Sequence, residues 1–165
     1  MPLISAPLEK SIEAAFMAQS SPAVVANKLA TAYDNYCKGG LAGGVPPLLT
    51  GAEVKAMEGI LLAAIASPSG SPAIFAAAWT AALQAYWLAP PVVFSAPPIT
   101  GVATVMPGAG AVTPALTAAF SNTLNTEGII AKLIASIIGA ATKTVLVTFS
   151  TPTPPAGPPP PATVV

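Results

Sequence analysis

Charged side chains are scarce in this chain. They make up 7% of its 165 residues, whereas about a quarter of the residues in an ordinary soluble domain are charged. Arginine and histidine are absent, and no charged residue lies between Gly59 and Thr126. The chain therefore lacks most of the groups that perform acid–base catalysis, ligate a metal or bind a phosphate.

Cysteine is nearly absent as well. The single cysteine, Cys37, cannot form a disulfide within the chain, and it lies beside Tyr33 and Tyr36 in a helical pattern. A nucleophilic thiol is normally activated by a neighbouring base such as histidine, and the chain has none. The sequence therefore predicts a reduced, packed thiol at Cys37 and not a catalytic one.

The other motifs that could support chemistry are incomplete. Carboxylates are paired at Glu9 and Glu13, which share an ordinary solvated helix face, and at Glu53 and Glu58. Residues 108–110 read Gly-Ala-Gly but lack the third glycine and the lysine of the phosphate-binding loops, so they predict a flexible turn. A Ser–Lys dyad is conceivable in principle, yet no serine lies in the context of a nucleophile elbow. We expect no catalytic residue, no bound metal and no cofactor.

Nothing in the charge distribution favours nucleic acid. The net charge is zero and the six lysines are scattered, whereas binding to a duplex depends on several basic contacts to phosphates. The aromatic residues at helical spacing have no basic neighbour within twenty positions, so packing in the core or at an interface is the better interpretation; they are Phe75, Trp79, Tyr86 and Trp87.

Apolar residues, in contrast, are abundant. They make up 53% of the chain with only 6% aromatic residues, and the mean hydropathy is +0.71. A domain of this size leaves a large part of its surface exposed, so much apolar surface should lie outside the core. Exposed apolar patches usually mark interfaces.

Helix starts are easy to locate. Residues 21–22, 71–72 and 113–114 each place a hydroxyl residue before a proline, which suits an N-cap followed by the first helical position. Residues 50–53 fit a capping box. With the periodicity of apolar residues, these starts predict helices over 8–19, 22–38, 52–66, 72–89 and 126–142, and a shorter helix over 114–121.

Two segments predict strands. Residues 144–150 alternate between apolar and polar, and residues 99–106 are rich in β-branched side chains. Paired prolines at 90–91 and 97–98 bracket residues 92–94, which makes an extended arm the expected structure there and not a central strand. The expected fold is mainly α: an Ala-rich bundle of five or six short helices with a minor two-stranded β element and an extended Pro-rich C-terminal tail.

The tail has a separate composition. Residues 151–165 favour polyproline II, which has no internal hydrogen bonds and is not expected to join a core. We therefore expect a helical domain over 1–150 and an arm over 151–165. Deleting the arm should leave the domain folded but weaken assembly. The residues expected to contact neighbouring subunits are Phe94, Pro97, Pro98, Pro154, Pro155, Pro158, Pro159, Pro160, Pro161, Val164 and Val165.

A membrane role is the alternative. Residues 73–89 and 129–141 are apolar but shorter than the roughly twenty residues that a span needs. The first also contains Thr80 and Gln84, which favours helices packed in protein over a small pore or holin-like element. The first residues lack the basic and apolar regions of a signal peptide, so synthesis in the cytoplasm is expected.

Four segments of the second half resemble small structural proteins of tailed bacteriophages and phage-tail-like particles. They are residues 85–91, 99–105, 110–119 and 143–148, the last preceding a Gly/Pro-rich tail. The likeness covers about half of the chain. It implies a virion or tail component whose partners are other virion or tail subunits, including copies of itself. It carries over no site residues.

Overall fold

In the computed structural model of the protein, two helices begin directly at the predicted hydroxyl–proline pairs. The structure describes residues 3, 5–18, 20–96, 99–150 and 161–165. Helix α2 (Pro22–Cys37) follows Ser21, and α4 (Pro72–Leu88) follows Ser71, whose side chain accepts a hydrogen bond from the Ile74 backbone N–H at 3.3 Å. The proline at the first helical position has no N–H to leave unpaired, so the start is well defined.

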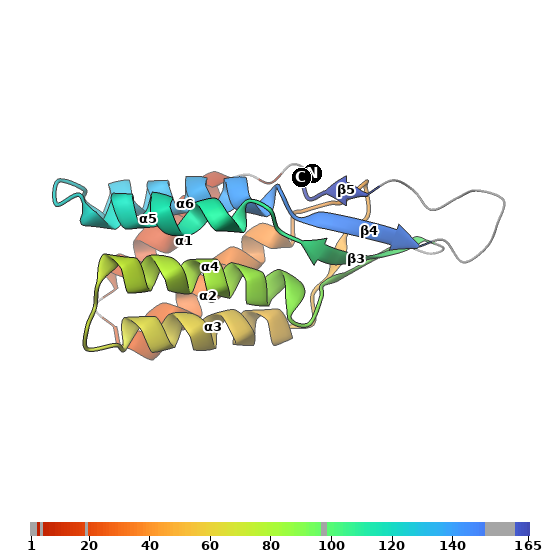
Figure 1. Ribbon diagram of the computed structural model, residues 1–165. Coiled ribbons are helices and arrows are strands. Elements are labelled where there is room, and N and C mark those ends of the chain that lie inside the picture. The colour runs from red at the N-terminus through yellow and green to blue at the C-terminus, as the bar shows by residue number, and fades with distance from the viewer. Residues whose placement is uncertain (1–2, 4, 19, 97–98, 151–160) are drawn as a thin grey trace.

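The helices form three antiparallel hairpins. The first helices of the hairpins are α1 (Ser5–Met17), α3 (Ala52–Ile65) and α5 (Ala109–Ser121), and they return through α2, α4 and α6 (Glu127–Thr142). Each helix packs mainly against the helices before and after it in the chain, and α1 packs against α6. The six helices therefore close into a ring, with the hairpin loops gathered at one end (Figure 1).

The three hairpins share one pattern of burial. In the returning helices, the residues at five equivalent positions are buried in every hairpin; these are Ala26, Ala76 and Ala131, then Leu29, Trp79 and Ile134, then Tyr33, Leu83 and Ile138, then Tyr36, Tyr86 and Ala141, then Cys37, Trp87 and Thr142. In the first helices the equivalent buried pairs are Leu8 and Ile12, Met57 and Leu61, and Val112 and Leu116. The ring is thus an internal threefold repeat of one helical hairpin.

A small sheet lies at the end of the ring where α2, α4 and α6 finish (Figure 1). Its strands run in the order β1 to β5, and every neighbouring pair is antiparallel. The strands are β1 (Pro47–Leu48), β2 (Val93–Ala96), β3 (Ile99–Val105), β4 (Leu146–Ser150) and β5 (Ala162–Thr163). At least one strand follows each returning helix, so the sheet collects chain from all three hairpins.

The mainly helical fold with a small antiparallel sheet is confirmed, and so is the pairing of the two predicted strands, with Val102 opposite Thr148. The expected number of two strands was wrong. The segment expected as an extended arm contains β2, which lies between β1 and β3. The prolines at 90–91 do not prevent this because they precede the strand, so no backbone N–H is missing from its ladder.

The start of α5 was also misplaced. The helix begins at Ala109 and not at 114, so Pro114 lies inside it and Thr113 is not a cap. The Thr113 hydroxyl instead bonds to the Thr80 hydroxyl of α4 at 2.6 Å. A proline at this place removes the bond to the Gly110 carbonyl, and Gly110 is exposed, so water can bond to that carbonyl. The predicted turn at 108–110 is largely the first turn of this helix.

The end of the chain belongs to the folded body. Strand β5 pairs with β4, Val164 is fully buried, and Val165 exchanges two backbone hydrogen bonds with Leu41, at 2.9 and 3.0 Å. The expectation that the tail cannot join a core was therefore wrong for its last residues. Residues 162–165 contain no proline, so each can donate a backbone N–H.

Candidate interaction surfaces

The polar side chains of the returning helices meet at the centre of the ring and bond to one another. Trp87 donates from Nε1 to the Tyr33 hydroxyl at 2.7 Å, and the Tyr33 and Thr142 hydroxyls lie 2.7 Å apart. Thr142 donates to the Ile138 carbonyl at 2.7 Å, so Tyr33 must be the donor to Thr142. This chain of donors ends on a backbone carbonyl and links α4, α2 and α6.

The one buried aspartate is equally occupied. Asp34 accepts a hydrogen bond from the Tyr86 hydroxyl at 2.9 Å, and its second oxygen forms an ion pair with Lys38 at 2.7 Å. A carboxylate held between a phenol and an ammonium group is a structural anchor between α2 and α4.

Cys37 is a buried thiol, as the sequence predicted. Burial raises its pKa well above the ordinary value of a cysteine, and the charge of Asp34 acts in the same direction. The thiolate is the reactive form of cysteine. At neutral pH the thiol therefore stays protonated and chemically inert.

Two further carboxylates, Glu53 and Glu58, stabilise helix α3. Glu53 is buried at the start of α3, where it accepts backbone N–H bonds from Thr50 at 3.1 Å and Gly51 at 2.9 Å. This forms the glutamate side of the predicted capping box. Glu58 contacts Lys55 at 2.9 Å, and Lys55 and Asn27 lower its pKa. In the part of the chain that the structure describes, no group of three or more acidic or cysteine residues could hold a metal ion.

The charged residues are distributed unevenly over the helices and strands. Helices α4 and α5 and all five strands lack charged residues, whereas α1, α2, α3 and α6 hold or adjoin all twelve. The exposed positions of α4 and α5 after their first residues are small or neutral: Ala73, Ile74, Ala77, Ala81, Gln84, Gly110, Ala111, Pro114, Ala118 and Ser121. We call α4, α5 and the outer face of the sheet the uncharged surface.

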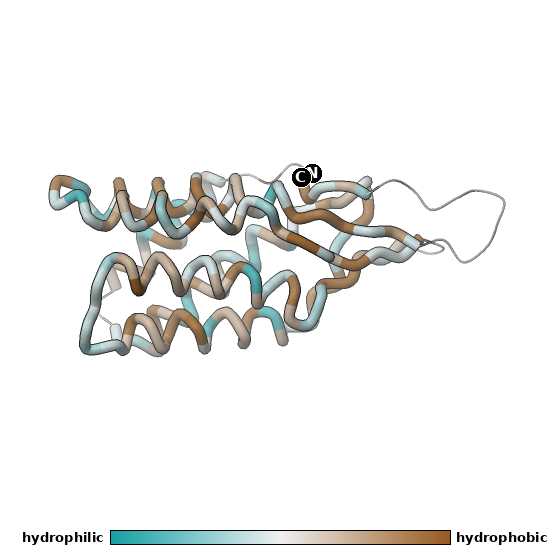
Figure 2. Tube along the Cα trace, in the orientation of Figure 1, coloured by the Kyte–Doolittle hydropathy of each residue, from teal (hydrophilic) through white to brown (hydrophobic). Residues whose placement is uncertain are grey.

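The outer face of the sheet continues this surface with valines and hydroxyl residues. Leu48, Val93 and Val102 are directly paired across three strands and are 52%, 38% and 42% exposed. Thr148 extends the row on β4. In Figure 2 the strands run from pale to brown without strong teal. Because this face has no charged group, burying it against another protein has a small desolvation cost.

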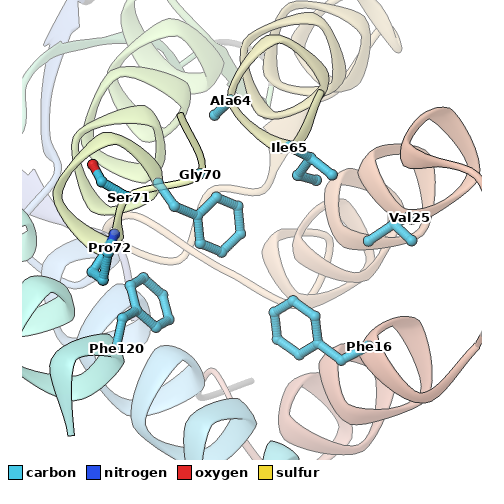
Figure 3. Close-up of a pocket in the computed structure, with 9 residues that line it drawn as sticks. Phe16, Val25, Ala64, Ile65, Gly70, Ser71, Pro72 and Phe120 are labelled. Atoms are coloured by element: carbon cyan, nitrogen blue, oxygen red, sulfur yellow. The ribbon is translucent and has the colours of Figure 1, made fainter. Parts of the chain in front are cut away.

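A second apolar feature lies at the opposite end, among the hairpin loops. A pocket of about 340 Å³ opens there between the helix ends, and Figure 3 shows its side chains arranged around one opening. A neighbouring pocket of about 320 Å³ shares Phe16, Phe75 and Phe120 with it. The first pocket is lined by Phe16, Val25, Ala64, Ile65, Gly70, Ser71, Pro72, Phe75 and Phe120.

The lining of these pockets follows the internal repeat. Phe16, Ile65 and Phe120 occupy the same position in the three first helices, and the returning helices contribute Val25, Phe75 and Ile130 at a second shared position. The pockets therefore form the open end of the ring. The pockets were not predicted from the sequence because the residues at each shared position vary among phenylalanine, isoleucine and valine. The helix starts after Ser21 and Ser71 were nevertheless a visible signal of the repeat.

The residues expected to contact neighbours have three different positions. Phe94 is fully buried and stacks on Trp87 with ring centroids 6.1 Å apart, so its assignment to an interface is corrected. Val164 is corrected for the same reason, while Pro161 and Val165 are exposed. The others lie outside the described residues: Pro97, Pro98, Pro154, Pro155, Pro158, Pro159 and Pro160.

None of the helices within the described ranges is both long and apolar enough to cross a membrane. Comparisons of the chain with protein-family models, with curated proteins and with solved structures found no match.

Proposed function

We propose that the protein is a structural subunit of a large protein assembly, of the bacteriophage virion or tail type that its sequence resembles. The observation that carries the proposal is the division of the surface. Charged residues lie on or beside four of the six helices, and α4, α5 and the sheet have none. In this proposal the uncharged surface packs against neighbouring subunits, which include copies of the same chain, and nucleic acid is not a partner.

The physical reason lies in the cost of desolvation. Burying an unpaired charge at an interface is costly, and the centres of protein interfaces are depleted in charged residues. Small side chains on α4 and α5 let a neighbouring backbone approach closely, so contact is made over many atoms. The row of apolar residues on the sheet adds area that favours association.

The proposal includes the absence of catalysis and of a bound cofactor. Its support is that the buried hydroxyl, carboxylate and thiol groups near the ring centre bond to one another or are held neutral by burial. The cluster thus stabilises the subunit. Detection of a stoichiometric metal or nucleotide in purified native protein would contradict this part.

Two matched variants test the interface. Ala77→Lys places a charge on the exposed face of α4, and Ala14→Lys makes the same change on the exposed face of α1, where charges are already present. Each variant would be produced with a tag in the natural source of the protein, and particles would be separated on a density gradient. We expect the unmodified chain and Ala14→Lys to sediment with a large particle, and Ala77→Lys to remain largely in the light fractions.

Thermal melts of both purified variants show whether the subunit itself is intact. Recovery of the unmodified chain only as a small free species would refute the proposed function. Equal incorporation of the two variants would place the interface elsewhere than α4.

A further inference from the structure

The loop between α5 and α6 holds an exposed leucine beside the apolar pocket. Leu124 is 85% exposed, the highest value among the large apolar side chains in the described residues. Its backbone N–H bonds to the Asn122 side chain at 3.1 Å, and Asn125 donates to the Ala119 carbonyl at 2.8 Å. These two bonds fix the loop, so Leu124 is presented in a set position.

The leucine and the pocket are neighbours at the same end of the ring. Phe120 lies in the last turn of the helix before the loop and Ile130 lies in the first turn of the helix after it, and both line the pockets. In Figure 1 the loop extends farther from the sheet than the loop between α3 and α4. Leu124 therefore lies beside the pocket region of its own chain and projects outwards.

We propose that two copies of the chain associate end to end, with Leu124 of each copy inserted into the pocket of the other. A surface that carries both an apolar projection and an apolar pocket is complementary to itself. When two copies are related by a two-fold axis, the projection of each copy meets the pocket of the other. The volume of each pocket is roughly ten times the volume of about 30 Å³ that one water molecule occupies. Each pocket can therefore accept a leucine side chain.

The other exposed residues at the hairpin-loop end of the ring also favour a second copy of the chain as the partner. Four other exposed apolar side chains surround the opening at the helix ends and would be buried between the copies: Met17, Val24, Ile74 and Ile129. Six helix ends, each about 10 Å across, present roughly 600 Å² per copy. Pairing would bury about 1,200 Å² in total, which is the lower limit for a specific interface. Apart from Ile74 at the start of α4, the dimer leaves the uncharged surface free, and it does not rest on the proposed function.

Sedimentation of the full chain over a range of concentrations measures the association. We expect a concentration-dependent dimer for the unmodified protein. Leu124→Asp should weaken it about tenfold or more, because it places a charge in an apolar pocket. Ser136→Asp, which adds the same charge to the exposed middle of α6, should not alter it, and Leu124→Met should largely retain it because methionine has a similar volume.

A second variant removes the hollow and keeps the projection. Ala64 lines the pocket, and Ala64→Met fills part of it with a flexible side chain that a helix tolerates. Alone, this variant should dimerise as poorly as Leu124→Asp. Mixed in equal amounts, the two variants should form a heterodimer tighter than either homodimer, because one of the two leucine–pocket pairs is then intact.

Three results would overturn the inference. They are a monomer at all concentrations up to about 1 mM, a dimer that Leu124→Asp leaves unchanged, and a mixture that associates no better than its components. Circular dichroism and thermal melting of each variant ensure that a lost dimer reflects lost contacts. A failure here leaves the particle sedimentation test of Ala77→Lys unaffected, so the two proposals fail separately.

Discussion

The aromatic residues at the centre of the ring differ in what their polar atoms do. Trp79 and Trp87 occupy buried positions of the same helix, and both are fully buried. Trp87 donates to Tyr33, whereas Trp79 Nε1 has no acceptor among the residues that the structure describes. A buried donor without a partner is destabilising, and a satisfied one contributes about 1 kcal/mol. Equal burial therefore does not imply equal contributions to stability.

Replacing each tryptophan by phenylalanine separates packing from hydrogen bonding. Both changes remove similar volume, but only Trp87→Phe leaves the Tyr33 hydroxyl without its donor. We expect Trp87→Phe to lower the free energy of unfolding by about 1–2 kcal/mol more than Trp79→Phe. Urea unfolding at neutral pH measures the difference, and equal losses would show that the Trp87 hydrogen bond contributes nothing.

The buried tyrosines predict a loss of stability in alkali. Burial raises the pKa of Tyr36 from its usual 10 to about 12, and it also raises the pKa values of Tyr33 and Tyr86 well above 10. Because the unfolded chain releases these protons first, the contribution is fully present below pH 10 and declines as the pH rises towards 12.

Tyrosine absorbance near 295 nm and circular dichroism, followed together from pH 8 to 12.5, check this prediction. Ionisation should coincide with unfolding. Ionisation of all three tyrosines near pH 10 with the helices intact would contradict the burial.

At the scale of single elements, the helices could be predicted and the edges of the sheet could not. Hydroxyl–proline pairs and apolar periodicity placed α2 and α4 within one residue. Strands β1 and β5 contain two residues each, too few to show any alternation. The start of α5 was predicted wrongly because a proline is common at the first position of a helix. The helix in fact begins five residues before Pro114 and contains this proline.

The close packing of β3 against β4 gives a prediction for one glycine. A Cβ at Gly101 would lie 2.5 Å from the Phe149 ring and 2.9 Å from Val147, whereas a Cβ at Gly59 in α3 would meet nothing within 4 Å. Gly101→Ala should therefore destabilise the protein by about 1–3 kcal/mol. Gly59→Ala should stabilise it by about 0.5–1 kcal/mol because alanine favours the helix.

Thermal melts of the two glycine variants test this contrast directly. A Gly101→Ala protein that melts with or above the unmodified chain would show that Phe149 can move aside at little cost.

At the scale of the whole molecule, the threefold repeat could not be recognised in the sequence because the three hairpins differ in sequence. The same buried position is filled by Tyr33, Leu83 and Ile138 in the three hairpins, so no common motif marks it. The absence of charge from residues 59 to 126 was visible in the sequence, but only the fold shows that β2 and β3 of this segment join three further strands without charged residues. Phe94 was misassigned because local proline content does not reveal which strand face is buried.

The chain end closes the fold, and two adjacent valines test this. Val164 is fully buried near Gly40, whereas Val165 is 50% exposed. Val164→Ala should lower the free energy of unfolding by about 2 kcal/mol, and Val165→Ala should change it little. Chemical denaturation of both variants measures these changes in the free energy of unfolding. Equal, small effects would restore the expectation that the tail is independent of the domain.

The central claim is that the uncharged surface is buried between subunits. Hydroxyl-radical footprinting of the isolated chain and of the native particle, compared by mass spectrometry, tests it most directly. We predict strong protection in the particle of Leu48, Val93 and Val102 on the sheet and of Pro114 on α5, while exposed side chains on the charged face of α1 and α2 remain reactive. Unchanged reactivity on the sheet and α5, with protection on the charged face, would contradict the account.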